Sequence, residues 1–110
     1  MATWLYRIRP SRAAMLTEGP TPEEQRQVGQ HFAYLQDLCR QGVVHLAGRT
    51  LDSGPDSMGI VLFSAGDEAA ARALMESDPA VAGGVMQATL HPYGVALLNS
   101  DSLLKARQEG

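Results

Sequence analysis

The segment from Thr21 to Gly42 carries both ends of a helix in its own sequence, and it constrains the fold more than any other stretch. Thr21 can act as an N-cap, Pro22 fits the first helical position, and Glu24 completes a capping box. Gly42 marks the C-terminal end of the predicted helix. Between these ends, apolar residues recur at helical spacing at Val28, Phe32, Leu35 and Cys39, with His31 and Leu38 beside them. We therefore expect one long amphipathic helix lying on a sheet.

Segments with a period of two flank this helix and predict strands. Residues 3–9 alternate so that Trp4, Tyr6 and Ile8 share one face. Residues 43–48 and 58–64 are joined by a short turn-rich loop, which predicts an antiparallel hairpin. Residues 85–97 predict a last strand, whose later part Pro92 restricts to an edge or a bend.

A second helix is predicted over residues 66–79, with a cap at Asp67 and apolar residues at Ala71, Leu74 and Met75. Asp78-Pro79 should end it and cap a further short turn. Residues 10–24 hold three prolines and predict a loop. The order β-α-β-β-α-β is that of an α+β, ferredoxin-like fold with an antiparallel sheet and both helices on one face. We expect one domain over residues 1–97 and a tail over 98–110 that resembles a frayed helix.

Composition limits the classes of partner. A chain of 110 residues with a net charge of −3 argues against nucleic-acid binding. The only cysteine, Cys39, allows no disulfide within the chain and fits a reducing cytosol. No signal peptide and no membrane-spanning segment are evident, so we expect a cytoplasmic protein without membrane contact. The uncovered sheet face carries apolar residues, which favours a homodimer.

His31 is the first candidate for chemistry. The chain returns along the helix after Gly42, so Asp52, just past the second strand, could reach the imidazole and fix its tautomer for general-base catalysis. The alternative is that His31 fills the edge of the core and that Asp52 forms an Asx turn in its loop. Asp56 is a rival carboxylate in the same loop.

Three stretches resemble the YciI-like (YCII-related) family of small ferredoxin-like domains that dimerise into an α/β barrel. They are His31 with Leu35, the segment AGRTLD (47–52) and the segment from Ser77 to Leu97, which begins SDPAVAGG. The resemblance covers roughly residues 3 to 97 and implies a His/Asp pair that maps onto His31 and Asp52. It also implies a pocket wall that includes Asp78. Arg49 stands where the family usually has proline, and it could add a cation for an anionic ligand.

The family resemblance implies a small-molecule ligand and makes proton transfer on an organic acid or lactone the leading hypothesis, by a lyase or an isomerase. One similar class of proteins eliminates chloride from a ring-cleavage product, and related barrels isomerise lactones. Arg49, Asp78, His91 and Tyr93 are then the candidate substrate-binding residues. A metabolite-binding or regulatory dimer without catalysis is the alternative. A haem or oxygen-using monooxygenase ranks last, because no proximal histidine is evident.

The remaining polar residues give weaker indications of function. His91-Pro92-Tyr93 could line the pocket or simply form a bend. His45 alternates with Val44 and Leu46, so we expect it on the opposite face, where it would lie in a dimer interface. The serines lack a nucleophile-elbow motif, and the histidines lack metal-ligand spacing. We expect no metal and no cofactor.

Overall fold

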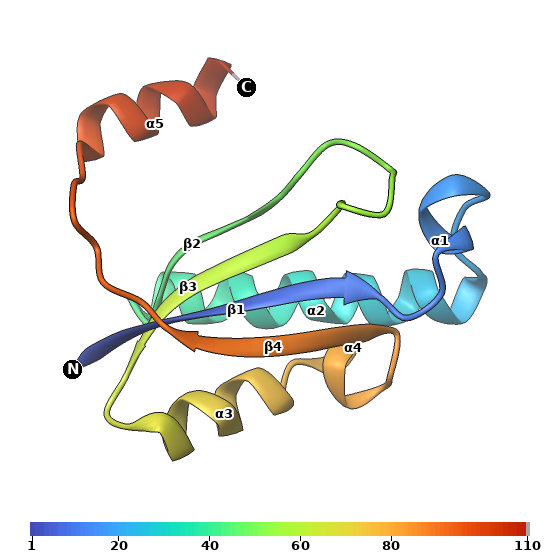
Figure 1. The fold of residues 1–110 in the computed structure, drawn as a ribbon, viewed down its shortest axis with the longest axis horizontal. Helices are drawn as coiled ribbons and strands as arrows, with labels where there is room; N and C mark the ends of the chain where they lie inside the picture. The colour runs from blue at the N-terminus through green and yellow to red at the C-terminus, as the bar shows by residue number, and fades with distance from the viewer. Residues whose placement is uncertain (110) are drawn as a thin grey trace.

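The computed structural model describes residues 1–109 (Figure 1). Its elements follow the predicted order, with one additional short helix, a short helix at the turn predicted after Asp78, and a helical tail. They are β1 (Ala2–Pro10), α1 (Ala14–Thr17), α2 (Pro22–Arg40), β2 (Val44–Arg49), β3 (Gly59–Ala65), α3 (Glu68–Glu76), α4 (Pro79–Ala82), β4 (Met86–Pro92) and α5 (Ser100–Glu109). The antiparallel α+β fold is confirmed.

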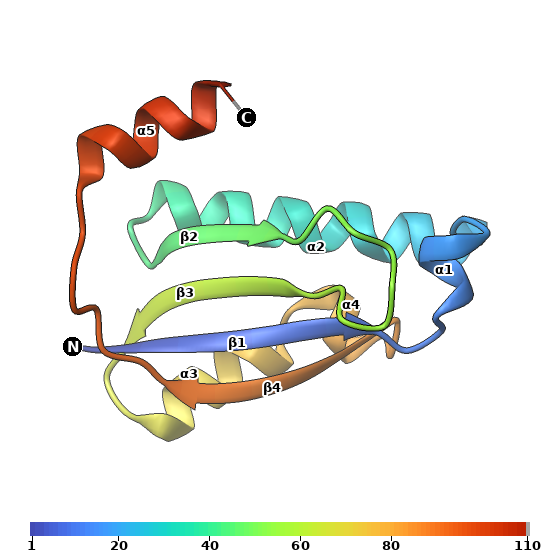
Figure 2. The ribbon, with the colours of Figure 1, turned by 45° about the horizontal axis from the view of Figure 1, so that its top comes forward.

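The four strands form one antiparallel sheet in the order β2-β3-β1-β4. Helices α2 and α3 lie on the same side of this sheet, as both ribbon views show (Figures 1 and 2). Trp4, Tyr6 and Ile8 share the covered face, as predicted, and Tyr6 packs edge-on against Phe63. We call the uncovered side the open face.

The open face is defined by the cross-strand register. Leu5 lies opposite Leu62 on one neighbour and opposite His91 on the other. A bulge in β2 places Leu46 opposite Leu62, while His45 bonds the Ser64 hydroxyl at 2.7 Å. The prediction that His45 and Leu46 point to opposite faces is therefore wrong, because the bulge interrupts the period of two.

The buried face of α2 is rotated relative to the predicted stripe. Glu24, Gln27 and Leu35 are buried, whereas Phe32 is 65% exposed and Cys39 is exposed. The spacing of the buried residues follows the helical repeat along one line, and Phe32 and Cys39 lie to its side. His31 lies on this buried line instead of on its flank.

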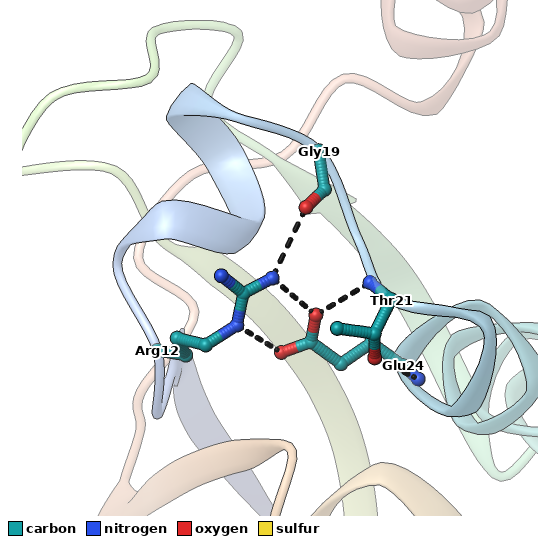
Figure 3. A network of polar contacts seen from close by, with 4 residues as sticks. All are labelled: Arg12, Gly19, Thr21 and Glu24. Carbon is teal, nitrogen blue, oxygen red and sulfur yellow. Dashed lines mark hydrogen bonds and ion pairs between the residues drawn. The ribbon is translucent and has the colours of Figure 1, made fainter.

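The start of α2 is held by the predicted capping box and by one unpredicted ion pair (Figure 3). Thr21 and Glu24 exchange hydrogen bonds between side chain and backbone at 2.8 and 3.1 Å. Arg12 binds the Glu24 carboxylate through two nitrogens, at 2.6 and 3.0 Å, and also donates to the Gly19 carbonyl at 3.1 Å. The pKa of Glu24 falls to about 2, mainly because Arg12 bonds its charged form.

Two segments differ from the loop and strand that were predicted for them. Residues 14–17, expected in a loop, form α1, because Met15 is buried and its neighbours favour helix. β4 ends at Pro92, and residues 93–99 continue outside the sheet to α5. We call residues 93–109 the C-terminal arm. The helix predicted in the tail is present as α5, although Gly110 lies outside the described residues.

Candidate active site around His31 and Asp78

Asp78 is the centre of a buried hydrogen-bond network. Its side chain is fully buried and accepts from three elements. Tyr6 donates its hydroxyl to Oδ2 at 2.7 Å, and the backbone N–H of Ala80 donates to Oδ1 at 3.0 Å. The Nδ1 atom of His31 lies 2.8 and 2.7 Å from Oδ1 and Oδ2. A buried carboxylate is tolerated only with such partners, so the fold is built to keep Asp78 in this place.

Each partner in this network is positioned by a different part of the fold. Tyr6 comes from β1, an inner strand of the sheet, and its side chain points to the covered face. His31 comes from the buried line of α2, which packs against α4. Asp78 is the N-cap of α4, where its extended backbone and the following Pro79 start the short helix. The Asp-Pro step therefore aims the carboxylate at the junction of α2, α4 and β1.

The network selects one tautomer of the imidazole. A carboxylate accepts hydrogen bonds, so Nδ1 of His31 carries the proton that points at Asp78. The other ring nitrogen, Nε2, has no hydrogen-bond partner within residues 1–109. The His31 side chain is 14% exposed, so the imidazole is not sealed inside the core. A neutral His31 thus presents the lone pair of Nε2 as a base.

Two tyrosines beside this network are held in the neutral form. Burial raises the pKa of Tyr6 far above its usual range, and the negative charge of Asp78 raises it further. Burial and the same charge raise the pKa of Tyr34, whose hydroxyl donates to the Leu74 carbonyl at 2.7 Å. Tyr34 therefore ties α2 to α3, and Tyr6 remains a donor to Asp78 across the physiological pH range.

Asp52 does not meet His31 in the structure, and the predicted pairing is corrected in favour of Asp78. Asp52 is exposed in the loop between β2 and β3, where its carbonyl accepts from the Ser57 hydroxyl at 2.5 Å. Asp56 is exposed in the same loop. The prediction placed the returning end of β2 beside His31, but the residue that reaches the imidazole comes from α4, which packs on α2.

The other candidate binding residues form no hydrogen bond with His31. Arg49 ends β2 and borders a shallow hollow on the β2–β3 hairpin with Leu46, Gly48, Thr50, Met58 and Ile60. His91 pairs with Leu5 on the open face and lies 3.3 Å from the Thr89 hydroxyl. Tyr93 begins the C-terminal arm, and its backbone N–H donates to the Thr3 carbonyl at 3.1 Å. Of the predicted set, Asp78 alone contacts His31.

Tyr6 is the member of the network that sequence reasoning missed. The period of two places it correctly on the covered face, where the pattern indicates only a core residue. A tyrosine at a buried position needs an acceptor for its hydroxyl, and this requirement is the available signal. It points to a buried carboxylate or carbonyl nearby.

No group of three or more histidine, cysteine, aspartate or glutamate side chains within residues 1–109 is arranged to hold a metal ion. None of the helices in this range combines the length and the hydropathy that a membrane crossing requires.

Comparison with known proteins agrees with the fold. The family model of the YCII-related domain matches residues 5–90. A solved structure of 5-chloro-2-hydroxyhydroquinone dehydrochlorinase (TftG) from Burkholderia phenoliruptrix AC1100, in complex with 2,5-dihydroxybenzoquinone, is 17% identical with a TM-score of 0.60. The match covers 83% of this chain and 93% of that one.

A second similar structure is SnoaB, a cofactor-independent oxygenase from Streptomyces nogalater, at 13% identity and a TM-score of 0.44. That match covers 89% of this chain and 97% of the other. No curated protein matches the sequence.

Proposed function

Because the chain belongs to the YCII-related domain family, we propose that it is a small-molecule enzyme in which His31 transfers protons as a general base. Asp78 replaces Asp52 as the partner of His31 in this proposal. The substrate class is a small organic acid, lactone or hydroxylated ring with an acidic proton near a carbonyl group. The reaction is an elimination or an isomerisation.

The observation that carries this proposal is the buried carboxylate behind the imidazole. Asp78 accepts from His31 Nδ1 at 2.7 Å and is itself fixed by Tyr6 and by a backbone N–H. This arrangement orients the ring and stabilises the imidazolium that forms when Nε2 takes a proton. Asp78 and Tyr6 are thus positioning residues, and His31 is the catalytic residue.

The proposed proton transfer needs no oxidant or reductant. Nε2 of His31 takes a proton from the carbon next to the carbonyl, and the electron pair of that C–H bond becomes an enolate. In an isomerisation the imidazolium returns the proton to another atom, and in an elimination a leaving group such as chloride departs with an electron pair. The dehydrochlorinase with the similar fold supports the second form, since dehydrochlorination removes a proton and a chloride.

We further propose that the protein works as a homodimer that meets its substrate in the cytoplasm, without nucleic acid or membrane. Apolar side chains on the open face support the dimer, because a sheet face exposed to water favours a second layer. Arg49, His91 and Tyr93 are not part of the minimal site, since they form no hydrogen bond with His31 or Asp78 within one chain.

A deuterium-exchange assay tests the proton transfer by itself, whichever step follows it. The protein is incubated in D₂O with a panel of small lactones, keto acids and hydroxyquinones that includes 2,5-dihydroxybenzoquinone. Loss of the C–H signal is followed by NMR. We expect exchange into at least one compound by the wild type, and a fall of at least about 100-fold in His31→Gln, the scale of a lost general base.

His91→Gln is the matched control, because His91 is an exposed histidine on the open face. It should exchange as fast as the wild type. Saturable binding without exchange would favour a metabolite-binding module, and equal rates in His31→Gln and the wild type would contradict the role of His31.

A further inference from the structure

The C-terminal arm is exposed along its whole length and makes few contacts within its own copy, such as the hydrogen bond from Tyr93 to Thr3. Within residues 1–109, α5 contains no buried residue and makes no extensive contact with another element. Both ribbon views show α5 held away from the sheet and from α2, with residues 93–99 as its connection (Figures 1 and 2). Leu97 is 94% exposed and Leu98 is 71% exposed. A linker without a binding role is expected to carry polar side chains, so two adjacent exposed leucines favour a surface that covers them.

The open face carries the matching surface. Leu5, Leu46 and Leu62 face one another across three strands, and Ile60 adjoins them on β3. A shallow hollow beside this group is lined by Leu46, Met58 and Ile60. The fold therefore leaves two apolar surfaces uncovered, one on the sheet and one on the arm.

The arm is long enough to reach a copy that faces the sheet. Residues 93–99 can span up to about 23 Å, which exceeds the separation of about 10 Å between stacked sheets. The arm can therefore cross to a facing copy and add its own apolar side chains to the interface between the two sheets.

We propose that the C-terminal arm of one copy packs on the open face of a second copy, with Leu97 and Leu98 against the hollow on the β2–β3 hairpin. Both arms are exchanged by the two-fold symmetry of the pair. The inference rests on the homodimer proposed above and specifies the segment that holds it together.

Cross-linking between two single-cysteine variants tests the exchange directly. In a Cys39→Ser background, Leu97→Cys places a thiol on the arm and Leu46→Cys places one on the open face. After the two full-length variants are mixed and oxidised, we expect a disulfide-linked pair that contains one chain of each. A chain carrying both cysteines should also link to a second chain. A disulfide within that single chain would mean that the arm folds back on its own sheet, and would overturn the proposal.

Light scattering coupled to size exclusion provides the second readout. Leu97→Asp should raise the dissociation constant of the dimer by about tenfold or more, because it places a charge in an apolar contact. Phe32→Asp is the control, since Phe32 is 65% exposed on α2, which lies on the covered side of the sheet, away from the open face.

The outcomes separate this inference from the function proposed above. A dimer that is unaffected by Leu97→Asp contradicts arm exchange and leaves the homodimer intact. A monomer at all concentrations contradicts both the dimer and the exchange, whereas proton exchange by His31 is measured independently of either.

Discussion

Asp78 and Asp52 are both aspartates next to helix-breaking or turn-forming residues, yet the fold treats them in opposite ways. Asp78 is completely buried, and three donors converge on its carboxylate. Asp52 is exposed in a loop, where the contact it makes with Ser57 uses its backbone carbonyl. The chain returns along α2 before it reaches Asp52, but this path does not make Asp52 the partner of His31. The decisive difference is the supply of donors at a buried position.

Removing the buried carboxylate should have the largest effect on stability. Asp78→Ala leaves the Tyr6 hydroxyl and the His31 ring without their acceptor, and we expect a loss of about 2–6 kcal/mol in the free energy of unfolding, since each buried donor left unpaired costs about 1–3 kcal/mol. Asp52→Ala should change it by less than about 0.5 kcal/mol. Urea denaturation of the two variants measures both values. Comparable losses would show that the two aspartates are not distinguished in this way.

Removing one donor should have a smaller effect. Tyr6→Phe deletes the hydroxyl that donates to Asp78 but keeps the ring against Phe63. We expect a loss of about 1.5–3 kcal/mol, the range for a hydrogen bond to a charged group. Tyr93→Phe is the control, because the Tyr93 side chain is 46% exposed. If both substitutions lower the free energy of unfolding equally, the hydroxyl of Tyr6 makes no specific contribution to stability.

The same hydroxyl predicts a pH dependence on the alkaline side. The pKa of Tyr6 is raised in the folded protein by burial and by Asp78, so above its ordinary value of 10.0 the unfolded chain releases a proton that the native one keeps. Stability should therefore be complete below about pH 10 and decrease as pH rises further. Tyr6→Phe should reduce this slope in denaturation curves between about pH 9 and 11, whereas an unchanged slope would contradict a buried, neutral Tyr6.

The ion pair at the start of α2 predicts a weaker dependence on the acidic side. The pKa of Glu24 is lowered from 4.5 to about 2 by Arg12, so its contribution is present above about pH 4.5 and is lost as pH falls toward about 2. Glu24→Gln should reduce the acid sensitivity of thermal unfolding in this window.

Glu23 offers a matched comparison at the same helix end. Its pKa is also lowered to about 2, mainly by Arg26, but this pair is exposed. In about 1 M salt we expect the effect of Glu23→Gln to disappear because exposed charges are screened, while the effect of Glu24→Gln persists in part. Equal loss of both effects would argue against a special role for the Arg12 pair.

Much of the fold could be predicted from local patterns. The capping box of α2, the faces of β1 and the Asp-Pro start of α4 depend on residues within a few positions of one another, and the β2–β3 hairpin depends on a single turn-rich loop. Each of these features is observed. The buried side of α2 is harder to predict from the sequence, because polar Glu24 and Gln27 are buried there while Phe32 is exposed. A hydrophobic pattern cannot recognise a polar side chain that is buried because it is paired.

The site itself depends on contacts between distant parts of the chain. The sequence identifies both His31 and Asp78 as candidates, but their pairing spans 47 positions and Tyr6 is 72 positions from Asp78. No spacing rule connects residues across three elements. Only the packing of α4 against α2 brings them together.

The most direct test of the account is the tautomer of His31, read from the ring nitrogens by long-range ¹H–¹⁵N NMR at a pH where the ring is neutral. We predict that the wild type and Asp52→Asn carry the proton on Nδ1 and leave Nε2 unprotonated. In Asp78→Asn the ring should lose this preference. A proton on Nε2 in the wild type, or a change in Asp52→Asn with none in Asp78→Asn, would contradict the central claim that Asp78 holds His31 as a base.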